Sequence, residues 1–441
     1  MKQEPILSVG IVSASEIQFT LHGNFNTETS GIVCTGEQTV CLTEKGIQYG
    51  GECYAELTFC PTDKSSCFTL NDVVIGIGFH WERKEPQSFA GSLRIIVEEN
   101  RLTAVNVIPV EEYLKSVISS EMSATASLEL LRAHAVISRS WLLSQLAKKS
   151  DLQAQSGNYI SDVRTETEWI KWWDREDHTL YDVCADDHCQ RYQGITRATT
   201  PAVVQAVEAT RGEVLMYNGA ICDARFSKCC GGVLEKFDNC WEPASHPYLQ
   251  KVFDRKEDAL SDTPDLSIEA EAEKWIRTSP EAFCNTRDKQ ILSQVLNNYD
   301  QETVDFYRWK VRYSQSEVAE LLARRTGIDF GQIVDLQPVE RGVSGRMIRL
   351  RIVGTKKTMV IGKELLIRKS LSESHLYSSA FVVEREHDKG VLPIAFTLTG
   401  AGWGHGVGLC QIGAAVMGEQ GYDYRAILLH YYRDAEILKS Y

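Results

Sequence analysis

The segment from Pro109 to Leu146 most constrains the fold of this 441-residue chain, because it reads as two consecutive helices. Pro109 stands where a helix can begin, since the N–H that proline lacks would have no partner in a first turn. The apolar residues that follow recur at helical spacing and form one stripe: Val110, Tyr113, Leu114, Val117 and Ile118. We therefore predict helices over residues 109–121 and 127–147.

Glu121 lies four residues after Val117 and three after Ile118, so a continuous helix would place its carboxylate on the apolar stripe. Apolar surroundings disfavour the ionised form, so we predict a raised pKa for Glu121 and a carboxyl that can donate a proton near neutral pH. The residues leave a second reading open, in which Glu121 caps the turn over residues 123–127.

The two helical segments resemble the signature of the stage II sporulation protein D and LytB family. They read IPVEEYLKSVISSEM at residues 108–122 and LELLRAHAVISRSW at residues 128–141. In that family the glutamate of Ser-Glu-Met is the acid/base of a lytic transglycosylase that acts on peptidoglycan glycan strands. The resemblance implies that Glu121 is the catalytic residue here.

The glycine-rich stretch GAGWGHGVGLCQIGAAVMGEQGYDYRAILLHYY, residues 400–432, also resembles this family. Alternate glycines allow unusual backbone angles and close approach of a ligand, although a structural turn would use them equally well. The run RFSKCCGG, residues 225–232, is similar to a family segment that ends in Ser-Gly-Gly and lines the substrate groove. Our candidate substrate contacts are Arg139, Tyr192, Ser227, Lys228, Gly231, His405, Gly406 and Gln411.

Two features of residues 225–232 suggest chemistry beyond the resemblance. Lys228 could supply positive charge for the lactyl carboxylate of a muramic acid. Cys229 or Cys230 could instead be a nucleophile paired with His405 or His134, although buried thiols more often only pack.

A second cluster, His178, Cys184, His188 and Cys189, lies within twelve residues of sequence. Two thiols and two imidazoles are the ligands that tetrahedral zinc prefers, although a surface histidine with buried thiols, or a local disulfide, would give the same pattern. Some members of the resembled family carry zinc here, just before a Gln-x-Tyr-x-Gly stretch, which is residues 190–194 in this chain. Four protein ligands would make the zinc structural, whereas three would leave room for an activated water.

The order of the segments predicts an α+β fold. It has a β-rich N-terminal part, a helical pair that carries Glu121, mixed strands, and a glycine-rich C-terminal loop followed by helices. Glu99 and Asn100 are expected in a hairpin turn, and VVQAVEATRGEVLMYNGAICDARFSKCCGG, from residue 203, reads as short strands. We predict a β-rich region over 1–107, a catalytic core in two parts over 108–254 and 336–441, and a helical accessory insertion over 255–335.

Charge and hydropathy limit the partners. Forty-seven Lys and Arg against 60 Asp and Glu give a net charge of −13, which argues against a nucleic-acid partner. No run of about 18 apolar residues predicts a membrane span, and the alternating N-terminal residues do not resemble a signal peptide. The compartment stays open, although a peptidoglycan substrate would imply the cell envelope.

The resemblance implies a lytic transglycosylase that cleaves between N-acetylmuramic acid and N-acetylglucosamine and forms a 1,6-anhydro-muramic end, with Glu121 as general acid and base. Peptidoglycan glycan strands are the expected partner, and a cell-wall amidase is a second one. Two alternatives stay open. The protein could be a non-catalytic glycan-binding enhancer of an amidase, or a zinc-dependent hydrolase.

Overall fold

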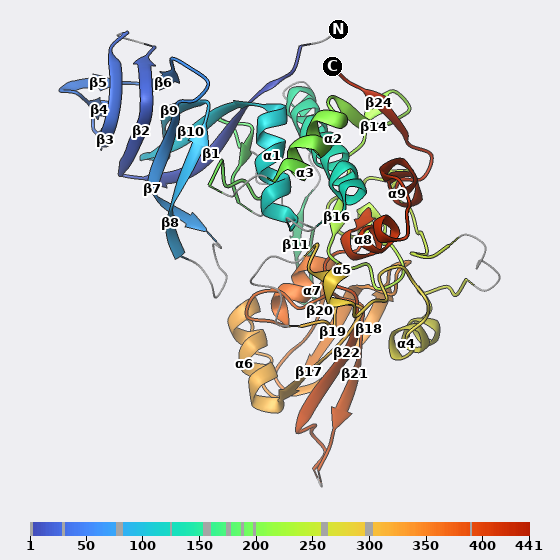
Figure 1. The fold of residues 1–441 in the computed structure, drawn as a ribbon. Helices are drawn as coiled ribbons and strands as arrows, with labels where there is room; N and C mark the ends of the chain where they lie inside the picture. The colour runs from blue at the N-terminus through green and yellow to red at the C-terminus, as the bar shows by residue number, and fades with distance from the viewer. Residues whose placement is uncertain are drawn as a thin grey trace.

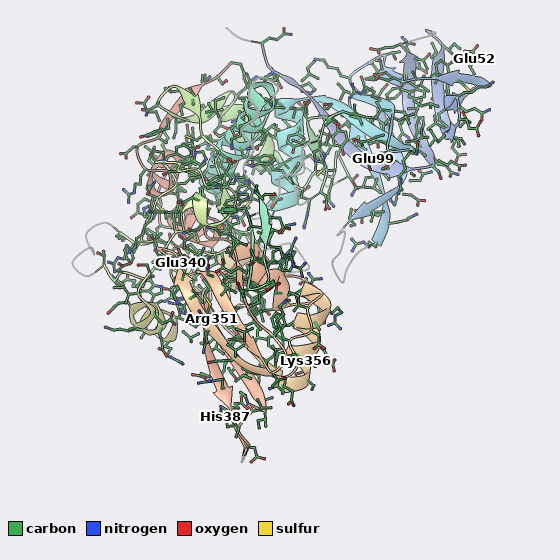
Figure 2. All side chains as sticks on the ribbon, turned by 180° about the vertical axis from the view of Figure 1, so that it is seen from behind. Glu52, Glu99, Glu340, Arg351, Lys356 and His387 are labelled. Carbon is green, nitrogen blue, oxygen red and sulfur yellow. The ribbon has the colours of Figure 1, made fainter. Side chains whose placement is uncertain are left out.

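The structure is a computed structural model and confirms the predicted α+β class, with 24% helix and 38% strand. It describes residues 3–28, 31–75, 83–123, 126–152, 160–172, 178–186, 189–196, 200–256, 263–295, 303–388 and 390–441, with only the backbone of residues 149–152. Figure 1 shows the N-terminal sheet at one end, a helical middle part, and a second group of sheets at the other end. Seen from behind, Glu52 and Glu99 mark the first end and Lys356 and His387 the other (Figure 2).

The N-terminal region is a large sheet, as its alternating sequence predicts. Eleven strands pair in it, and most are antiparallel neighbours. They are β1 (Ile6–Ala14), β2 (Glu16–Thr27), β3 (Val33–Thr43), β4 (Gly46–Tyr49), β5 (Glu52–Tyr54), β6 (Leu57–Pro61), β7 (Cys67–Ile75), β8 (Arg83–Ala90), β9 (Ser92–Glu98), β10 (Arg101–Pro109) and β13 (Val183–Cys184). The short strand β13 joins this sheet in parallel beside β1, which brings a distant segment against it.

The hairpin between β9 and β10 confirms the predicted turn. Arg101 pairs with Glu98, and the two residues between them, Glu99 and Asn100, have φ values of 48° and 60°. Two consecutive positive φ values are typical of the two-residue hairpin turn whose twist matches that of the strands.

The predicted helical pair is confirmed as α1 (Val110–Glu121) and α2 (Leu128–Leu152). Pro109 is the N-cap of α1, and Glu111 and Glu112 lie in its first turn, where they complement the helix dipole. The five residues of the predicted apolar stripe are fully buried. One continuous hydrophobic core extends from the N-terminal sheet through these helices to the C-terminal helices.

The prediction of strands from residue 203 is wrong for the first part of that segment. Residues Pro201–Ala209 form helix α3, which packs against α1 and α2. The Thr200 side chain accepts a hydrogen bond from the Val203 N–H, and Pro201 occupies the first turn, so a local cap outweighs the strand preference of the valines. Short strands follow as predicted: β14 (Glu213–Tyr217), β15 (Ala220–Ile221) and β16 (Phe226–Ser227).

The rest of the chain forms two further sheets with a separate hydrophobic core. One contains β11 (Asp162–Arg164), β12 (Glu168–Lys171), β18 (Ile333–Arg341), β19 (Met347–Gly354) and β20 (Thr358–Gly362), and the other β17 (Arg308–Ser314), β21 (Phe381–Glu386) and β22 (Ala395–Ala401). The helices of this part are α4 (Glu269–Arg277), α6 (Gln315–Thr326) and α7 (Glu364–Ser370), whereas α5 (Lys289–Leu292) contributes Leu292 to the first core. The four-part division of the chain stays a prediction, but β17 of the expected insertion pairs along its whole length with β22.

The chain returns to the helical middle part at its C-terminal end. Strand β23 (Leu409–Cys410) pairs in parallel with β16, helices α8 (Gln411–Glu419) and α9 (Tyr424–Tyr431) pack against α2, and β24 (Glu436–Lys439) pairs with β14. Figure 1 shows α8 and α9 beside α2. Within the described residues, no helix is both long and apolar enough to cross a membrane.

Candidate active site and metal centre

Glu121 is the last residue of α1 and is half-buried. The backbone N–H of Arg191 donates to its Oε1 at 3.4 Å. Burial raises the pKa of the nearby Tyr113 phenol, and the charges of Cys189, Cys184 and Glu121 add to this rise. The carboxylate therefore lies against the segment that carries the predicted metal ligands.

The turn after α1 is held by a residue that the sequence analysis missed. The Ser123 N–H donates to the carbonyl oxygen of Gln294, and the Ser127 N–H donates to its side-chain oxygen, both at 3.0 Å. The amide nitrogen of Gln294 in turn donates to Glu419 at 2.6 Å. Both ends of this turn are thus capped by Gln294, which weakens the reading of Glu121 as its cap. No local pattern could have identified a partner so far away in sequence.

Three of the four predicted metal ligands come together. The ligand atoms of His178, Cys184 and Cys189 all lie within 4.8 Å of one another, and Cys189 Sγ is 3.6 Å from His178 Nε2. A sulfur and a nitrogen bound tetrahedrally to one zinc ion would be about 3.6 Å apart. His188, the predicted fourth ligand, lies outside the described residues. The geometry of the other three fits a zinc ion.

The segment after these cysteines connects the metal centre to both helices. The Gln193 N–H donates to Ser116 of α1 at 3.2 Å, and the Gln190 side chain donates to the Ser138 carbonyl of α2 at 3.3 Å. Together with the bond from Arg191 to Glu121, these contacts fix residues 190–193 along the helical pair. A structural metal at Cys184 and Cys189 would therefore stabilise the backbone that contacts Glu121.

Arg139 and Tyr192, two predicted substrate contacts, are buried and already bonded within the protein. Arg139 forms a bidentate ion pair with Glu111, in which Nε donates to Oε1 at 2.9 Å and Nη2 donates to Oε2 at 2.7 Å. No part of the Arg139 side chain is exposed. The Tyr192 hydroxyl donates to Asn106 at 2.6 Å, and its ring stacks on Tyr113 with centroids 4.9 Å apart. This geometry favours packing roles for both residues.

The motifs at 225–232 and 400–411 lie side by side, because Ser227 of β16 pairs with Cys410 of β23. Ser227 is buried, and its hydroxyl has no hydrogen-bond partner in the described residues. Lys228 is half-buried and donates to the Val295 carbonyl at 2.5 Å. Val295 directly follows Gln294, which caps the turn after α1. The segment of Gln294 and Val295 therefore contacts both Lys228 and the turn that follows Glu121.

The glycine-rich loop adopts the predicted unusual backbone angles. The φ values of Gly402, Gly404, Gly406 and Gly408 lie between 72° and 97°. A Cβ atom on Gly406 would lie 2.4 Å from the Arg346 guanidinium carbon, and one on Gly408 would lie 1.9 Å from a backbone oxygen. These glycines therefore allow close approach of other parts of the protein, where the sequence analysis expected a ligand. The backbone of predicted contact Gly231 also has a positive φ, 79°, and packs directly against this loop.

His405 and Gln411, carried over as groove residues, are both bonded internally. The His405 ring packs edge-on against Trp241 with centroids 4.5 Å apart, and its Nδ1 accepts from the Val407 N–H at 3.0 Å. Burial, followed by the charges of nearby arginines, holds the pKa of His405 well below its usual value. Gln411 is buried and its amide lies 3.1 Å from His134 Nε2.

His134 is a buried histidine whose ring is bonded on both sides. Its Nδ1 lies 3.2 Å from the Ser138 hydroxyl, and its Nε2 faces the Gln411 amide. Burial, and then the charge of Lys228, lower the pKa of His134 to about 3. The imidazole is therefore neutral near pH 7. No thiol appears among the hydrogen-bond partners of His134 or His405 in the described part of the chain.

Comparisons with known proteins place this geometry in a family context. Residues 98–217 match the family described as "Stage II sporulation protein", and residues 235–408 match a "Domain of unknown function (DUF8618)". Stage II sporulation protein D of Bacillus subtilis (strain 168) is 22% identical over 357 residues, which cover 80% of each chain. The protein of the same name from Bacillus amyloliquefaciens is 25% identical over 343 residues, 76% of each chain.

A third similar protein has a different name. The "Amidase enhancer" of Bacillus subtilis (strain 168) is 25% identical over 331 residues. These residues cover 72% of the present chain and 39% of the amidase enhancer. Glu121, Cys184 and Cys189 all fall inside the residues that match the sporulation protein family.

Proposed function

Because residues 98–217 match the stage II sporulation protein family, we propose that the chain is a lytic transglycosylase of peptidoglycan glycan strands. The observation that carries the proposal is the position of Glu121. Its carboxylate follows a fully buried helical stripe, is half-buried itself, and accepts a hydrogen bond from the Arg191 backbone beside the Cys184 and Cys189 thiols.

One carboxyl group is sufficient for this reaction. Protonated Glu121 gives its proton to the glycosidic oxygen as the bond from that oxygen to the muramic acid C1 breaks. The 6-hydroxyl oxygen of the same sugar then bonds to C1 and gives its proton to the Glu121 carboxylate. The products are a 1,6-anhydro-muramic end and a free N-acetylglucosamine end. Glu121 is regenerated, and no water is consumed.

Lys228 is our candidate for holding an anionic group of the substrate. Two observations support it: the residue is half-buried, and its partner Val295 is adjacent to the residue that caps the turn after Glu121. A lysine in such a position can form a charge-assisted hydrogen bond to a carboxylate. Ser227, Gly231, His405, Gly406 and Gln411 would then shape the wall behind it, while Arg139 and Tyr192 support the helices.

We assign a structural zinc ion to His178, Cys184, His188 and Cys189. The mutual distances of the three described ligands support this assignment. Bound zinc would hold the loop before residues 190–193 in place, and the chain itself would carry out the reaction. Removal of a structural zinc ion would lower the temperature of the thermal transition. A zinc ion that assists hydrolysis would behave differently, because its removal would abolish activity without changing the thermal transition.

The test compares Glu121→Gln with Glu112→Gln on purified peptidoglycan. Glu112 lies on the same helix, with a half-exposed side chain that pairs with Lys115. We expect Glu121→Gln to lose at least about 100-fold in the rate of anhydro-muramic product formation, measured by mass spectrometry. Glu112→Gln should retain the wild-type rate. Unchanged product formation by folded Glu121→Gln would refute the assignment.

The similarity to the amidase enhancer supports a second candidate function, in which the protein grips glycan and stimulates an amidase. The two candidates differ in their products. An enhancer would raise the rate at which an added cell-wall amidase releases stem peptides. The Glu121→Gln variant would raise this rate as much as the unmodified chain does. It would form no anhydro-muramic ends.

A further inference from the structure

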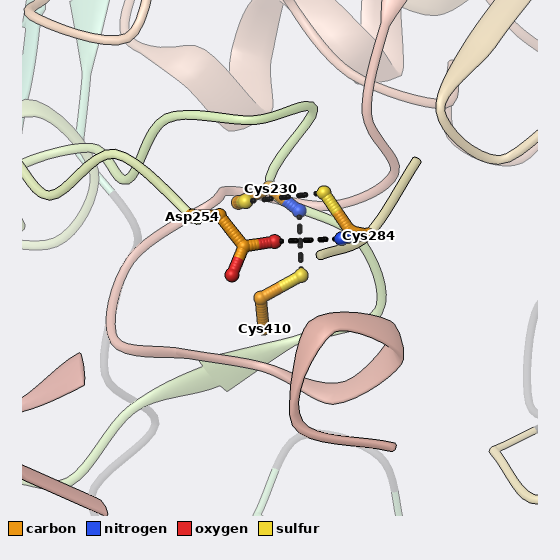
Figure 3. A group of neighbouring side chains, drawn as sticks. All are labelled: Cys230, Asp254, Cys284 and Cys410. Carbon is orange, nitrogen blue, oxygen red and sulfur yellow. Dashed lines mark hydrogen bonds between the residues drawn. The ribbon is translucent and has the colours of Figure 1, made fainter. Parts of the chain in front are cut away.

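A second group of metal-ligating side chains lies in the interior, apart from the site around Glu121. Cys230, Asp254, Cys284 and Cys410 are at most 2% exposed, and their ligand atoms all lie within 4.8 Å of one another. Figure 3 shows the three thiols and the carboxylate pointing toward one common point. Their positions, 230, 254, 284 and 410, are spread over most of the C-terminal half of the chain.

We propose that these four residues bind one zinc ion. Two sulfurs bound to the same zinc at about 2.3 Å each are about 3.8 Å apart in a tetrahedron. Cys230 Sγ and Cys284 Sγ are 3.6 Å apart. Three thiolates and one carboxylate make four ligands, of which three are soft sulfur donors. Zinc binds such a set, whereas magnesium and calcium prefer oxygen ligands.

The carboxylate gives independent support. Asp254 has no exposed surface, and the nearest basic side-chain atom among the described residues is His430 Nε2, at 3.8 Å from its Oδ1. Its oxygens accept from the Tyr431 hydroxyl at 2.8 Å and from the Cys284 N–H at 3.0 Å. A buried carboxylate with no cation within hydrogen-bonding distance is costly, and a metal ion would compensate its charge.

The backbone around the cluster is built to hold it. The Cys230 N–H donates to Cys410 Sγ at 3.2 Å, and Cys410 directly precedes the first residue of α8, where the helix dipole favours a thiolate. A side chain on Gly413, one turn further along α8, would lie within 2.7 Å of the Asp254 oxygens. Glycine at 413 therefore leaves the space that the carboxylate needs to reach the helix terminus.

One buried cation, Arg346, contacts the backbone of the cluster. The buried Arg346 guanidinium donates to the Cys230 carbonyl at 3.1 Å. Four protein ligands leave no open position, so the ion would be structural. It would join the loop after β16, the Asp254 and Cys284 segments and the start of α8.

The experiment measures zinc in a chain whose other candidate metal site has been removed. The full chain carrying Cys184→Ser and Cys189→Ser should retain about one zinc ion per chain by plasma mass spectrometry. Addition of Cys410→Ser should reduce this to background. Addition of Cys222→Ser, at another fully buried thiol outside both clusters, should leave it unchanged.

A second measurement covers the case in which the Cys410 variant does not fold. X-ray absorption of zinc in the Cys184→Ser, Cys189→Ser chain should show a first shell dominated by sulfur. If this background variant itself does not fold, the unmodified chain should contain about two zinc ions. The proposal is overturned by a folded background variant without metal, by unchanged zinc in folded Cys410→Ser, by iron with acid-labile sulfide, or by a Cys230–Cys284 disulfide in non-reducing peptide maps.

Discussion

Arg139 illustrates how a single buried residue can hold the helical pair together. Its guanidinium binds both oxygens of Glu111 and also donates to the Glu213 carbonyl at 2.9 Å. Burial opposes ionisation of Glu111, but the ion pair with Arg139, with bonds from Tyr441 and the Gly212 N–H, outweighs it and lowers the Glu111 pKa. The pair therefore joins α1, α2 and the C-terminal strand region.

We expect Arg139→Ala to lower the free energy of unfolding by about 3–5 kcal/mol, because Glu111 would remain buried without a partner. The control is Arg312→Ala. Arg312 forms a similar two-pronged pair with Glu386, but its side chain is 56% exposed, and its loss should cost at most about 1 kcal/mol. Urea unfolding of the two variants measures both values, and equal losses would contradict the prediction.

His134 predicts a specific pH dependence of stability. Its pKa is lowered from 6.5 to about 3 in the folded protein, so between these values the unfolded chain binds a proton that the folded chain does not. The free energy of unfolding should therefore fall as pH falls below about 6.5, by roughly 1 kcal/mol per pH unit from this residue. His134→Gln should make this slope shallower, whereas His22→Gln, at an exposed histidine, should not. Urea unfolding at several pH values gives the slopes, and a parallel decline in His134→Gln would disprove the assignment.

At the scale of elements, local signals predicted what local interactions determine. Pro109, the acidic first turn and the apolar stripe identified α1, and the Glu99–Asn100 turn identified the hairpin. Spacing within twelve residues likewise grouped His178, Cys184 and Cys189. Helix α3 was missed because its valines favour strands, and the cap that decides it depends on a single threonine side chain.

The β9–β10 hairpin offers a test of turn chemistry. Glu99 and Asn100 are exposed, and both have left-handed backbone angles, which cost a residue with a side chain more than glycine. Replacing them with Asn-Gly should raise the free energy of unfolding by about 1 kcal/mol. Asn100→Val should lower it by about 1–2 kcal/mol. Thermal unfolding of both variants checks the opposite signs, and two shifts of the same sign would contradict the turn geometry.

At the scale of the whole molecule, the missed features are those made by contacts over long sequence separations. Cys230, Asp254, Cys284 and Cys410 follow no motif spacing, and Gln294 has no feature that would single it out. The burial of Arg139 and Tyr192 was equally hidden, because it depends on Glu111 and Asn106 from other elements. The α+β class and the resemblance to the sporulation protein family could be predicted, since they rest on runs of adjacent residues.

The last strand provides the prediction at this scale. β24 pairs with β14 from Glu436 to Lys439, and the Tyr441 hydroxyl donates to Glu111 at 2.5 Å. Removing residues 436–441 should lower the free energy of unfolding by roughly 3–5 kcal/mol, because several backbone bonds and the bond to Glu111 are lost. Tyr441→Phe keeps the strand and should lose only about 1 kcal/mol. Urea unfolding measures the free energy of unfolding of the truncated chain and of Tyr441→Phe. An equal decrease in both would contradict a contribution from the strand.

The contacts that join α1 and β14 to the strand β24 and to Tyr441 have a consequence for biosynthesis. While residues 436–441 are still inside the ribosome, α1 and α2 have been made but Glu111 lacks Tyr441 and β14 lacks its partner. A nascent chain at this stage would expose unfinished apolar surface and strand edges, the condition in which chaperones bind. Completion of the core is therefore expected only after residues 436–441 have left the ribosome, and at a rate limited by the search for distant partners.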